Sequence, residues 1–406
     1  MLTRRYPVSI TEAQKLLTKV KLEPQIEMLS TSEANHHVLA ADIEAPLDYP
    51  HFRRSGYDGY AIRAEDDDDF PKSFNVVGNI PAGAVFDHPL GKNEAVRIMT
   101  GASVPVNAGK VIMLEQTRAI PDHPDQIKIL VTQKHSNITE IGTEFKVHDL
   151  LISKNTELNP GGLAILSAFG IQKIPVYRRP KIAIITTGTE LLQSSDSLVL
   201  GKIYNSNLVL LKNLIQENGG LLTQAKQLID DKQLFQEALH QAIATNDIVI
   251  TDGGVSVGDF DFVADTARNA DNLLFNKLRM RPGSVTTAFI QDQTLILALS
   301  GNPGACFTAF YLYVEPILRR FLCQKSKVCK IKATLASPYH KINGFDRILR
   351  GVYQKTTTGY LVFPNGSDRS GDLSNLQTTT CLIKIPHSNR PIDLNTEVTA
   401  WLLPFR

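Results

Sequence analysis

The feature that most restricts the fold of this chain is an alternation of apolar runs and helical patterns between residues 182 and 321. Short runs rich in β-branched residues at 182–185 and 247–251 are typical of strands buried on both faces of a sheet. The alternation therefore predicts an α/β domain. The helical patterns cover residues 207–217, 232–244 and 303–321, and a further strand is expected at 295–299.

The chain has 406 residues, which is too long for this domain alone, because one hydrophobic core stops growing efficiently at roughly 250 to 300 residues. Residues 38–170 carry short β-type runs separated by Gly, Pro and Asp, which indicates irregular β structure in two pieces. Before them, Ser9 and Glu12 form a capping-box pattern that predicts a short helix over residues 9–20. β-type runs return from about residue 330. We therefore expect an α/β plus β multidomain protein that ends in a small β domain.

Composition and charge exclude several classes of protein. With 43% hydrophobic and 21% charged residues, the chain has the composition of an ordinary globular protein. Its net charge of +2 is too small for the basic field that holds nucleic acid. No run approaches the roughly 18 apolar residues of a membrane helix, and the N-terminus lacks the apolar core of a signal peptide. We expect a cytoplasmic protein that binds neither nucleic acid nor a membrane.

Outside the α/β region, few residues point to chemistry. The four cysteines lack CxxC spacing, so we expect neither a disulfide framework nor a structural zinc site. His51 and His148 lack paired ligand spacing and are expected at the surface. The acidic run at residues 65–69 is expected to be a solvated turn.

The strongest local signal is the glycine-rich loop at residues 251–261, directly after a predicted buried strand. Ligands of open α/β sheets bind beyond the carboxyl ends of strands. Glycines there let backbone N–H groups approach a phosphate closely, and carboxylates suit Mg²⁺ bound to the same phosphate. The alternative is a glycine-rich turn without a ligand. The residues that favour a ligand site are Gly253, Gly254, Ser256, Gly258, Asp259 and Asp261.

Three further segments place polar groups beside the predicted strands. Glu190 brings a carboxylate to a second strand end, although it would also stabilise the first turn of a helix. Residues 299–304 precede a long helix whose N-terminal N–H groups could bind an anion, or they form an ordinary connection. Arg279 and Arg281 could clamp a phosphate or another oxyanion, or lie at the surface. The residues alone thus indicate an anion-binding, Mg²⁺-assisted α/β domain.

In the first half of the chain, Asp58 and Thr100 are isolated polar groups within turn-like segments. Asp and Thr are common in turns, so their chemistry alone favours neither a functional nor a purely structural role.

Seven segments follow one another along nearly the whole chain. They are Ser55-Gly-Tyr-Asp-Gly-Tyr-Ala61, Val96-Arg-Ile-Met-Thr-Gly-Ala102, Thr186-Thr-Gly-Thr-Glu-Leu191, Asn205-Ser-Asn207, Asp252-Gly-Gly-Val-Ser-Val-Gly258, Arg281-Pro-Gly283 and Gly301-Asn-Pro303. Together, and in this order, they resemble the molybdopterin molybdenumtransferase family, which includes the E domain of gephyrin. Each segment alone is weak evidence for the family, but seven segments in the same order are highly specific for it.

The resemblance implies an elongated subunit of four domains. The expected domains are an elongated N-terminal domain of residues 1–50 and 145–178, a β-rich second domain of 51–144, an α/β molybdopterin-binding domain of 179–328 and a small C-terminal β domain of 329–406. The α/β domain would resemble molybdopterin-binding adenylyltransferases. The resemblance also implies a homodimer, with the active cleft between the α/β domain of one subunit and the second domain of its partner.

The resemblance further implies the reaction and the residues that perform it. Adenylylated molybdopterin is bound, its phosphoanhydride is cleaved with Mg²⁺, AMP leaves, and molybdate enters the dithiolene. The residues that match the family's functional acids and hydroxyl are Asp58, Thr100, Glu190 and Asp261. The expected metal ligands are Asp259, Asp261 and Glu190. The residues expected to bind the adenylylated pterin are Asn205, Ser206, Asn207, Gly253, Gly254, Val255, Ser256, Gly258, Arg281, Gly301, Asn302 and Pro303.

Two other functions stay open at this point. A molybdopterin adenylyltransferase would share the α/β domain, but the long N-terminal region and the C-terminal β domain argue against it. A scaffold that kept the fold and lost catalysis would bind a partner peptide, yet Asp58, Glu190 and Asp261 are intact. An upstream adenylyltransferase and the recipient molybdoenzymes are the further partners that the favoured function implies.

Overall fold

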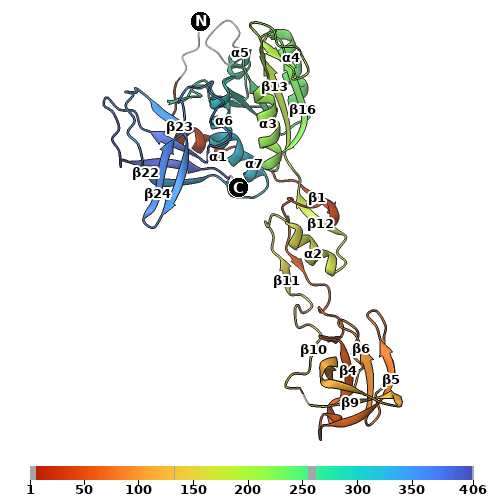
Figure 1. Ribbon diagram of the computed structural model, residues 1–406. Helices are drawn as coiled ribbons and strands as arrows, with labels where there is room; N and C mark the ends of the chain where they lie inside the picture. Colours follow the sequence, from red (N-terminus) through yellow and green to blue (C-terminus); the bar gives the residue numbers. More distant parts are fainter. Residues whose placement is uncertain (1–5, 132, 255–261, 405–406) are drawn as a thin grey trace. The chain divides into compact units, whose positions relative to one another are not determined.

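A computed structural model describes residues 6–131, 133–254 and 262–404 (Figure 1). The chain forms two compact units. The larger unit comprises Met1–Leu29, Ala34–Ala40 and Pro175–Arg406, and the smaller unit comprises Ser30–Glu33 and Ala41–Ile174. The prediction of an α/β plus β multidomain fold is confirmed by their secondary structure.

A mixed sheet forms the centre of the larger unit. Four neighbouring strands are parallel, and the last two continue the sheet antiparallel. The two parallel strands at residues 181–187 and 248–252 are rich in β-branched residues, as the apolar runs in the sequence predicted, because helices cover both faces of the sheet there. In sheet order the strands are β16 (Leu221–Leu228), β13 (Lys181–Thr187), β17 (Ile248–Asp252), β21 (Thr294–Leu299), β20 (Thr287–Gln291) and β18 (Asn272–Phe275).

Two hydrophobic clusters attach the helices to this sheet. One face packs against α1 (Ile10–Thr18), α3 (Ser206–Glu217) and a long helical run near the C-terminal end of the α/β region. The other face packs against α4 (Lys232–Ile243) and α5 (Phe262–Arg268). The capping box predicted for the first helix is present, since the Glu12 N–H donates to Ser9 Oγ at 3.1 Å.

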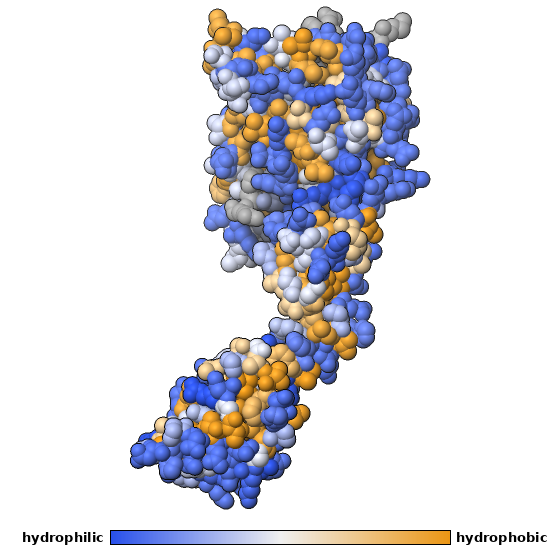
Figure 2. Space-filling model, turned by 90° about the vertical axis from the view of Figure 1, so that its right-hand side faces the viewer, coloured by the Kyte–Doolittle hydropathy of each residue, from blue (hydrophilic) through white to orange (hydrophobic). Residues whose placement is uncertain are grey.

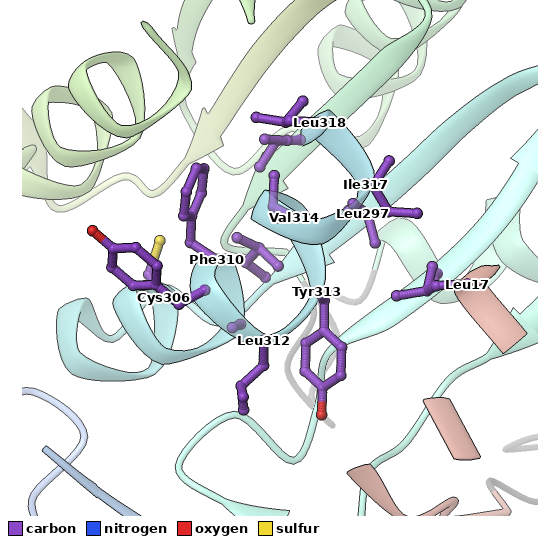
Figure 3. Packing of buried hydrophobic residues seen from close by; sticks show 14 of the residues in the cluster. Leu17, Leu297, Cys306, Phe310, Leu312, Tyr313, Val314, Ile317 and Leu318 are labelled. Atoms are coloured by element: carbon purple, nitrogen blue, oxygen red, sulfur yellow. The ribbon is translucent and has the colours of Figure 1, made fainter. Parts of the chain in front are cut away.

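The long helix predicted over residues 303–321 contains a change of helical pitch. It consists of α6 (Pro303–Ala309), a π-helical turn η4 (Phe310–Val314) and α7 (Glu315–Phe321). Pro316 has no N–H for the carbonyl four residues earlier, and its ring crowds that carbonyl, which favours a wider turn. Figure 3 shows Phe310, Val314 and Leu318 of this run in the cluster that also holds Leu17 of α1 and Leu297 of β21.

The C-terminal part of the larger unit is a small β barrel. Its sheet closes because β25 pairs with both β26 and β23. A short strand from the α/β region of the sequence, β19 (Met280–Arg281), pairs with β23 at the edge of the barrel's sheet. The barrel strands are β22 (Cys329–Leu335), β23 (Asp346–Thr356), β24 (Gly359–Pro364), β25 (Cys381–Ile385) and β26 (Glu397–Leu402).

The smaller unit is built around another β sheet, with a hydrophobic cluster on each face. In sheet order its strands are β7 (Ala108–Met113), β4 (Gly59–Arg63), β6 (Glu94–Ile98), β5 (Lys72–Ile80), β9 (His123–Ile129) and β8 (Thr117–Ile120).

The other described elements of the two units form short two-stranded pairings, helices and helical turns. They are β1 (Ile26–Ser30), β12 (Lys173–Tyr177), β2 (Ile43–Glu44), β11 (Leu150–Ile152), β3 (Arg54–Ser55), β10 (Ile138–Thr139), β14 (Leu191–Leu192), β15 (Ile203–Tyr204), α2 (Pro160–Ala168), η1 (Thr31–Glu33), η2 (Ala64–Asp66) and η3 (Leu114–Gln116).

The expectation that the acidic run is a solvated turn is wrong at Asp66. This side chain is buried and accepts hydrogen bonds from Arg63 Nε at 2.8 Å and from the Asn93 N–H at 3.2 Å. A paired carboxylate can be buried because the guanidinium and the N–H replace its water. Asp66 therefore fixes the end of β4 to the residue before β6.

His51 and His148 are exposed, as the sequence predicted. The four cysteines are free. No helix in the described residues is long and apolar enough to cross a membrane. Hydrophobic residues nevertheless reach the surface of both units, as Figure 2 shows for one side of the molecule.

Candidate functional site

The turns after three neighbouring parallel strands form the candidate site of the larger unit. β13 pairs with β17 through Thr186 and Asp252, and Asp252 pairs in turn with Leu299 of β21. These registers bring the turn of Glu190, the turn of Gly253 and the turn of Gly301 to one edge of the sheet. A Cβ placed on Gly301 would lie 3.8 Å from the Cα atom of Gly253, so the last two turns are neighbours.

Glycine is required at the turn after β17. Gly253 has a φ of +88° and Gly254 a φ of +64°, both in the left-handed region that side chains disfavour. A Cβ on Gly253 would also lie 2.4 Å from the carbonyl oxygen of Thr187. Packing of this turn against the end of β13 therefore requires glycine at position 253, while the expected approach of its N–H groups to a phosphate stays a prediction. The other residues expected in this loop, Val255, Ser256, Gly258, Asp259 and Asp261, lie outside the described residues.

The first turn of α3 connects the ends of all four parallel strands. Asn205 is the N-cap of α3, accepting from the Leu208 N–H, and its amide donates to Thr186 Oγ1 at 2.8 Å and Gln227 Oε1 at 2.9 Å. Asn207 Nδ2 donates to Asp252 Oδ2 and to the Gly301 carbonyl, both at 2.9 Å. Asn205 and Asn207 are thus buried within the framework of the strand ends, and Ser206 lies between them.

Asp252 is a functional candidate that the sequence reasoning did not single out. It is the last residue of β17 and only 3% exposed. Burial raises its pKa to about 7, the hydrogen bond from Asn207 opposes that shift, and the charge of Glu190 adds to it. Strongly shifted carboxyls collect at functional sites. The available signal in the sequence was an acidic residue directly continuing an apolar strand run.

A cavity of about 550 Å³ lies between the α/β part and the barrel of the larger unit. Arg281, Ser300 and Asn302 line its α/β side, and Lys341 and Arg347 lie on its barrel side. Basic side chains outnumber acidic ones in this lining, so the cavity suits an anion. The complete lining is Arg281, Pro282, Gly283, Ser284, Val285, Ser300, Asn302, Lys341, Arg347, Asp368, Arg369 and Ser370.

The acid of the cavity, Asp368, is already paired with donors. It accepts from Tyr339 Oη at 2.8 Å, Lys341 Nζ at 2.5 Å and Arg347 Nη1 at 3.1 Å. Burial raises the pKa of Asp368, but the hydrogen bonds from Lys341 and Tyr339 and the charge of Arg347 lower it overall. Its negative charge is therefore compensated. Arg281 lies with its guanidinium carbon 4.3 Å from the ring centre of Phe345.

A buried arginine holds the barrel side of the cavity in place. Arg350 is 4% exposed and donates to Asn375 Oδ1 at 2.5 Å and to the Arg369 carbonyl at 3.1 Å. The adjoining Ser370 carbonyl accepts from the Gly304 N–H at 2.8 Å, so this N–H at the start of α6 is used within the fold. Pro303, also expected to contact the substrate, is the first residue of α6 and has no N–H to offer.

The remaining candidates, Asp58 and Thr100, lie together in the smaller unit. Asp58 Oδ1 accepts from the Thr100 N–H at 2.6 Å and from Thr100 Oγ1 at 2.7 Å. The N–H bond, then the hydroxyl bond, lower the pKa of Asp58, and the charge of Arg97 acts in the same direction. Both side chains are exposed, so this carboxylate is ionised and accessible.

Known proteins resemble the chain over nearly its whole length. Residues 8–170 match the MoeA N-terminal region (domain I and II), residues 183–320 match a probable molybdopterin binding domain, and residues 332–403 match the MoeA C-terminal region (domain IV). The molybdopterin molybdenumtransferases of Staphylococcus epidermidis and Staphylococcus aureus are both 38% identical to it, over 95% of this chain and 93% of each relative. The chain belongs to the molybdopterin molybdenumtransferase family.

Solved structures of this family share the fold. Two structures described as molybdopterin biosynthesis MoeA protein from Pyrococcus horikoshii match with TM-scores of 0.80 and 0.73. Both are 29% identical to this chain and cover 98% of it, with 99% and 100% of their own lengths. The resemblance to the molybdopterin molybdenumtransferase family that the seven sequence segments carried is therefore confirmed.

Proposed function

We propose that this chain inserts molybdate into adenylylated molybdopterin and releases AMP, as a molybdopterin molybdenumtransferase. One observation carries the proposal beyond family membership. The turn after β21 supplies Ser300 and Asn302 to the cationic cavity, while Gly301 of the same turn adjoins Gly253. A site for an oxyanion and a site for a phosphate are thus contiguous, as a reaction that exchanges AMP for molybdate requires.

The cavity side of this arrangement suits molybdate. A dianion needs hydrogen-bond donors and positive charge, which Arg281, Lys341, Arg347 and Arg369 supply. The paired Asp368 adds little repulsion because its donors compensate its charge. Ser284 and Ser300 contribute hydroxyl groups that can donate to an oxyanion.

The strand-end side fits a phosphate and a Mg²⁺ ion. Mg²⁺ is usually held by one or two carboxylates together with substrate phosphate oxygens. Glu190 offers one carboxylate at this edge, and the proposed ligands Asp259 and Asp261 follow the turn of Gly253 in the sequence. When bound, Mg²⁺ would neutralise the charge that develops on the displaced phosphate. The chain itself contributes the left-handed backbone of Gly253 and Gly254 at this turn.

We further propose that the working form is a homodimer in the cytoplasm. In the larger unit, Leu198, Val199, Leu200, Ile203 and Val209 are exposed although they are apolar. Exposed apolar residues close together in the sequence favour an interface with another protein surface. Asp58 and Thr100 would then complete the active site of the partner subunit. An upstream adenylyltransferase and recipient molybdoenzymes are the proposed further partners.

The experiment that tests the proposed function measures AMP. The full-length protein is incubated with adenylylated molybdopterin and Mg²⁺, with and without molybdate, and AMP is quantified by chromatography. Molybdate-dependent release of AMP is expected. An adenylyltransferase would instead form adenylylated molybdopterin from molybdopterin and MgATP, and a scaffold would do neither. Either of those results would contradict the proposal.

A variant of the cavity sharpens this test. Arg369→Ala removes one cation from the cavity lining and is expected to raise the molybdate concentration for half-maximal AMP release by about tenfold, the usual order for a lost hydrogen bond to a charged group. Lys332→Ala is the matched control, because Lys332 pairs with Glu397 on the exposed surface of the same barrel. Equal molybdate dependence of the two variants would place molybdate elsewhere.

A further inference from the structure

Asp252 is a buried polar group to which the proposed reaction assigns no role. Its Oδ2 accepts from Asn207, whereas its Oδ1 is buried and has no hydrogen-bond partner in the described part of the chain. Burying a carboxyl with one oxygen unpaired is unfavourable. The other oxygen of Asp252 shows what this carboxyl does, since it accepts the hydrogen bond from Asn207.

The group that Asp252 holds is the amide of Asn207. An asparagine amide can rotate by half a turn and exchange its oxygen for its nitrogen. Both neighbours of Nδ2 here, the Asp252 oxygen and the Gly301 carbonyl, are acceptors at 2.9 Å. These two acceptors fix the orientation with Nδ2 between them, because the amide oxygen in that place would face only acceptors.

Asn207 in turn fixes the position of the turn that follows β21. Its hydrogen bond to the Gly301 carbonyl fastens this turn to α3, and the start of α3 is fastened to β13 and β16 by Asn205. The N–H groups of Gly301 and Asn302 form no hydrogen bond within the described residues. They lie in the turn that adjoins Gly253, since a Cβ on Gly301 would be 3.8 Å from the Gly253 Cα atom.

We propose that Asp252 is a positioning residue, which orients the Asn207 amide and thereby holds the Gly301–Asn302 turn where its N–H groups bind the phosphate of the adenylylated substrate. The assignment rests on the proposed function. In this proposal Asn207 supports the Gly301–Asn302 turn, whereas the sequence analysis expected Asn207 to contact the pterin directly. Asp252 acts by accepting a hydrogen bond, so a neutral acceptor in its place should serve as well.

Substitutions at two positions test the proposal with AMP as the probe ligand, measured by calorimetry on the full-length protein with Mg²⁺. Asp252→Asn keeps an acceptor oxygen and should bind AMP within about threefold of the unchanged protein. Asp252→Leu has a similar size, suits a buried position and lacks the acceptor. It should weaken AMP binding by about tenfold or more, as should Asn207→Ala, since the turn loses its alignment with a charged ligand.

Thr251→Val is the matched control. Thr251 is buried next to Asp252 on the same strand, its hydroxyl has no partner among the described residues, and Val preserves its shape. AMP affinity should be unchanged in this variant, and thermal melting should show that all four variants are folded. Normal AMP affinity in Asp252→Asn together with reduced AMP affinity in Asp252→Leu would support the positioning role of Asp252.

Three results would overturn the inference. Normal AMP affinity in folded Asp252→Leu would mean that the acceptor is dispensable. Equal losses in the Asn and Leu variants would mean that the charge matters and the hydrogen bond does not. A comparable loss in Thr251→Val would indicate a general disturbance of the strand end. Failure of the unchanged protein to bind AMP would instead contradict the proposed function, which makes the two failures distinguishable.

Discussion

At the scale of single residues, the protonation of Asp252 is linked to folding of the larger unit. An unfolded carboxyl ionises near its ordinary pKa of about 4, whereas burial raises the pKa of the folded Asp252 to about 7, with Glu190 adding to the shift. Between these values the folded chain holds a proton that the unfolded chain has lost. Stability contributed by Asp252 is therefore complete below about pH 4 and falls as the pH rises towards 7.

Asp252→Asn should remove this pH dependence. We expect the free energy of unfolding of the unchanged protein to fall, relative to the variant, by about 1.4 kcal/mol between pH 5 and pH 6, which is the linkage of one proton, and by less per pH unit as the pH approaches 7. Urea denaturation of both proteins across this range measures the difference. Parallel stability curves would contradict the prediction and would show that Asp252 is ionised in the folded protein throughout.

The sequence predicted the position of a residue well where that residue comes shortly after the end of a predicted strand. Glu190 and Gly253 lie at the carboxyl edge of the sheet because parallel strands end together. Asp252 was missed, because an acid after an apolar run looks like the first residue of a solvated turn. Asp66 was missed because it lies in a run of acidic residues, which favours a solvated turn. In both cases a distant partner, Asn207 or Arg63, makes burial possible.

At the scale of elements, the helical run of residues 303–321 shows how a proline is accommodated. The Leu312 carbonyl receives no N–H from Pro316, and Gln14 Nε2 of α1 donates to it at 3.2 Å. A side chain nearly three hundred positions earlier thus bonds to the π-helical turn. The sequence predicted the extent of this helix, but the π turn and its donor depend on tertiary contacts.

Gln14→Ala should destabilise the chain by about 1 kcal/mol, since a buried carbonyl loses a donor. The cost should shrink in a Pro316→Ala background, where residue 316 regains an N–H that can donate to the Leu312 carbonyl. Lys15→Ala is the control, because Lys15 is the exposed neighbour on the same helix. Thermal melting of the unchanged protein, the two single variants and the double variant gives the coupling energy between positions 14 and 316. An equal cost of Gln14→Ala in both backgrounds would refute this account.

At the scale of the whole molecule, the cationic cavity combines residues that no local pattern connects. Arg281 and Ser300 come from the α/β part, whereas Lys341, Arg347 and Arg369 come from the barrel. The sequence predicted an oxyanion role for Arg281 but none for the barrel residues. Their proximity depends on β19 pairing with β23 and on the Arg350 contacts, which are long-range features of the fold.

The largest expectation that concerns the whole molecule is the homodimer. A specific dimer interface buries about 800 Å² on each partner. The exposed Leu198, Val199, Leu200, Ile203 and Val209 of the larger unit are suitable residues for such a surface. Light scattering at micromolar concentration should give twice the 44.9 kDa of one chain. If Asp58 and Thr100 serve the partner's site, dissociation should also abolish AMP release.

A double substitution, Leu200→Asp with Ile203→Asp, should convert the dimer to a folded monomer, because two carboxylates would have to be buried without partners. Leu394→Asp is the matched control, since Leu394 is an exposed leucine of the barrel outside this surface. The control should keep the dimer mass and molybdate-dependent AMP release, and the double variant should lose both. A dimeric double variant would move the interface to another surface, and a monomeric double variant with normal AMP release would show that one subunit suffices for catalysis.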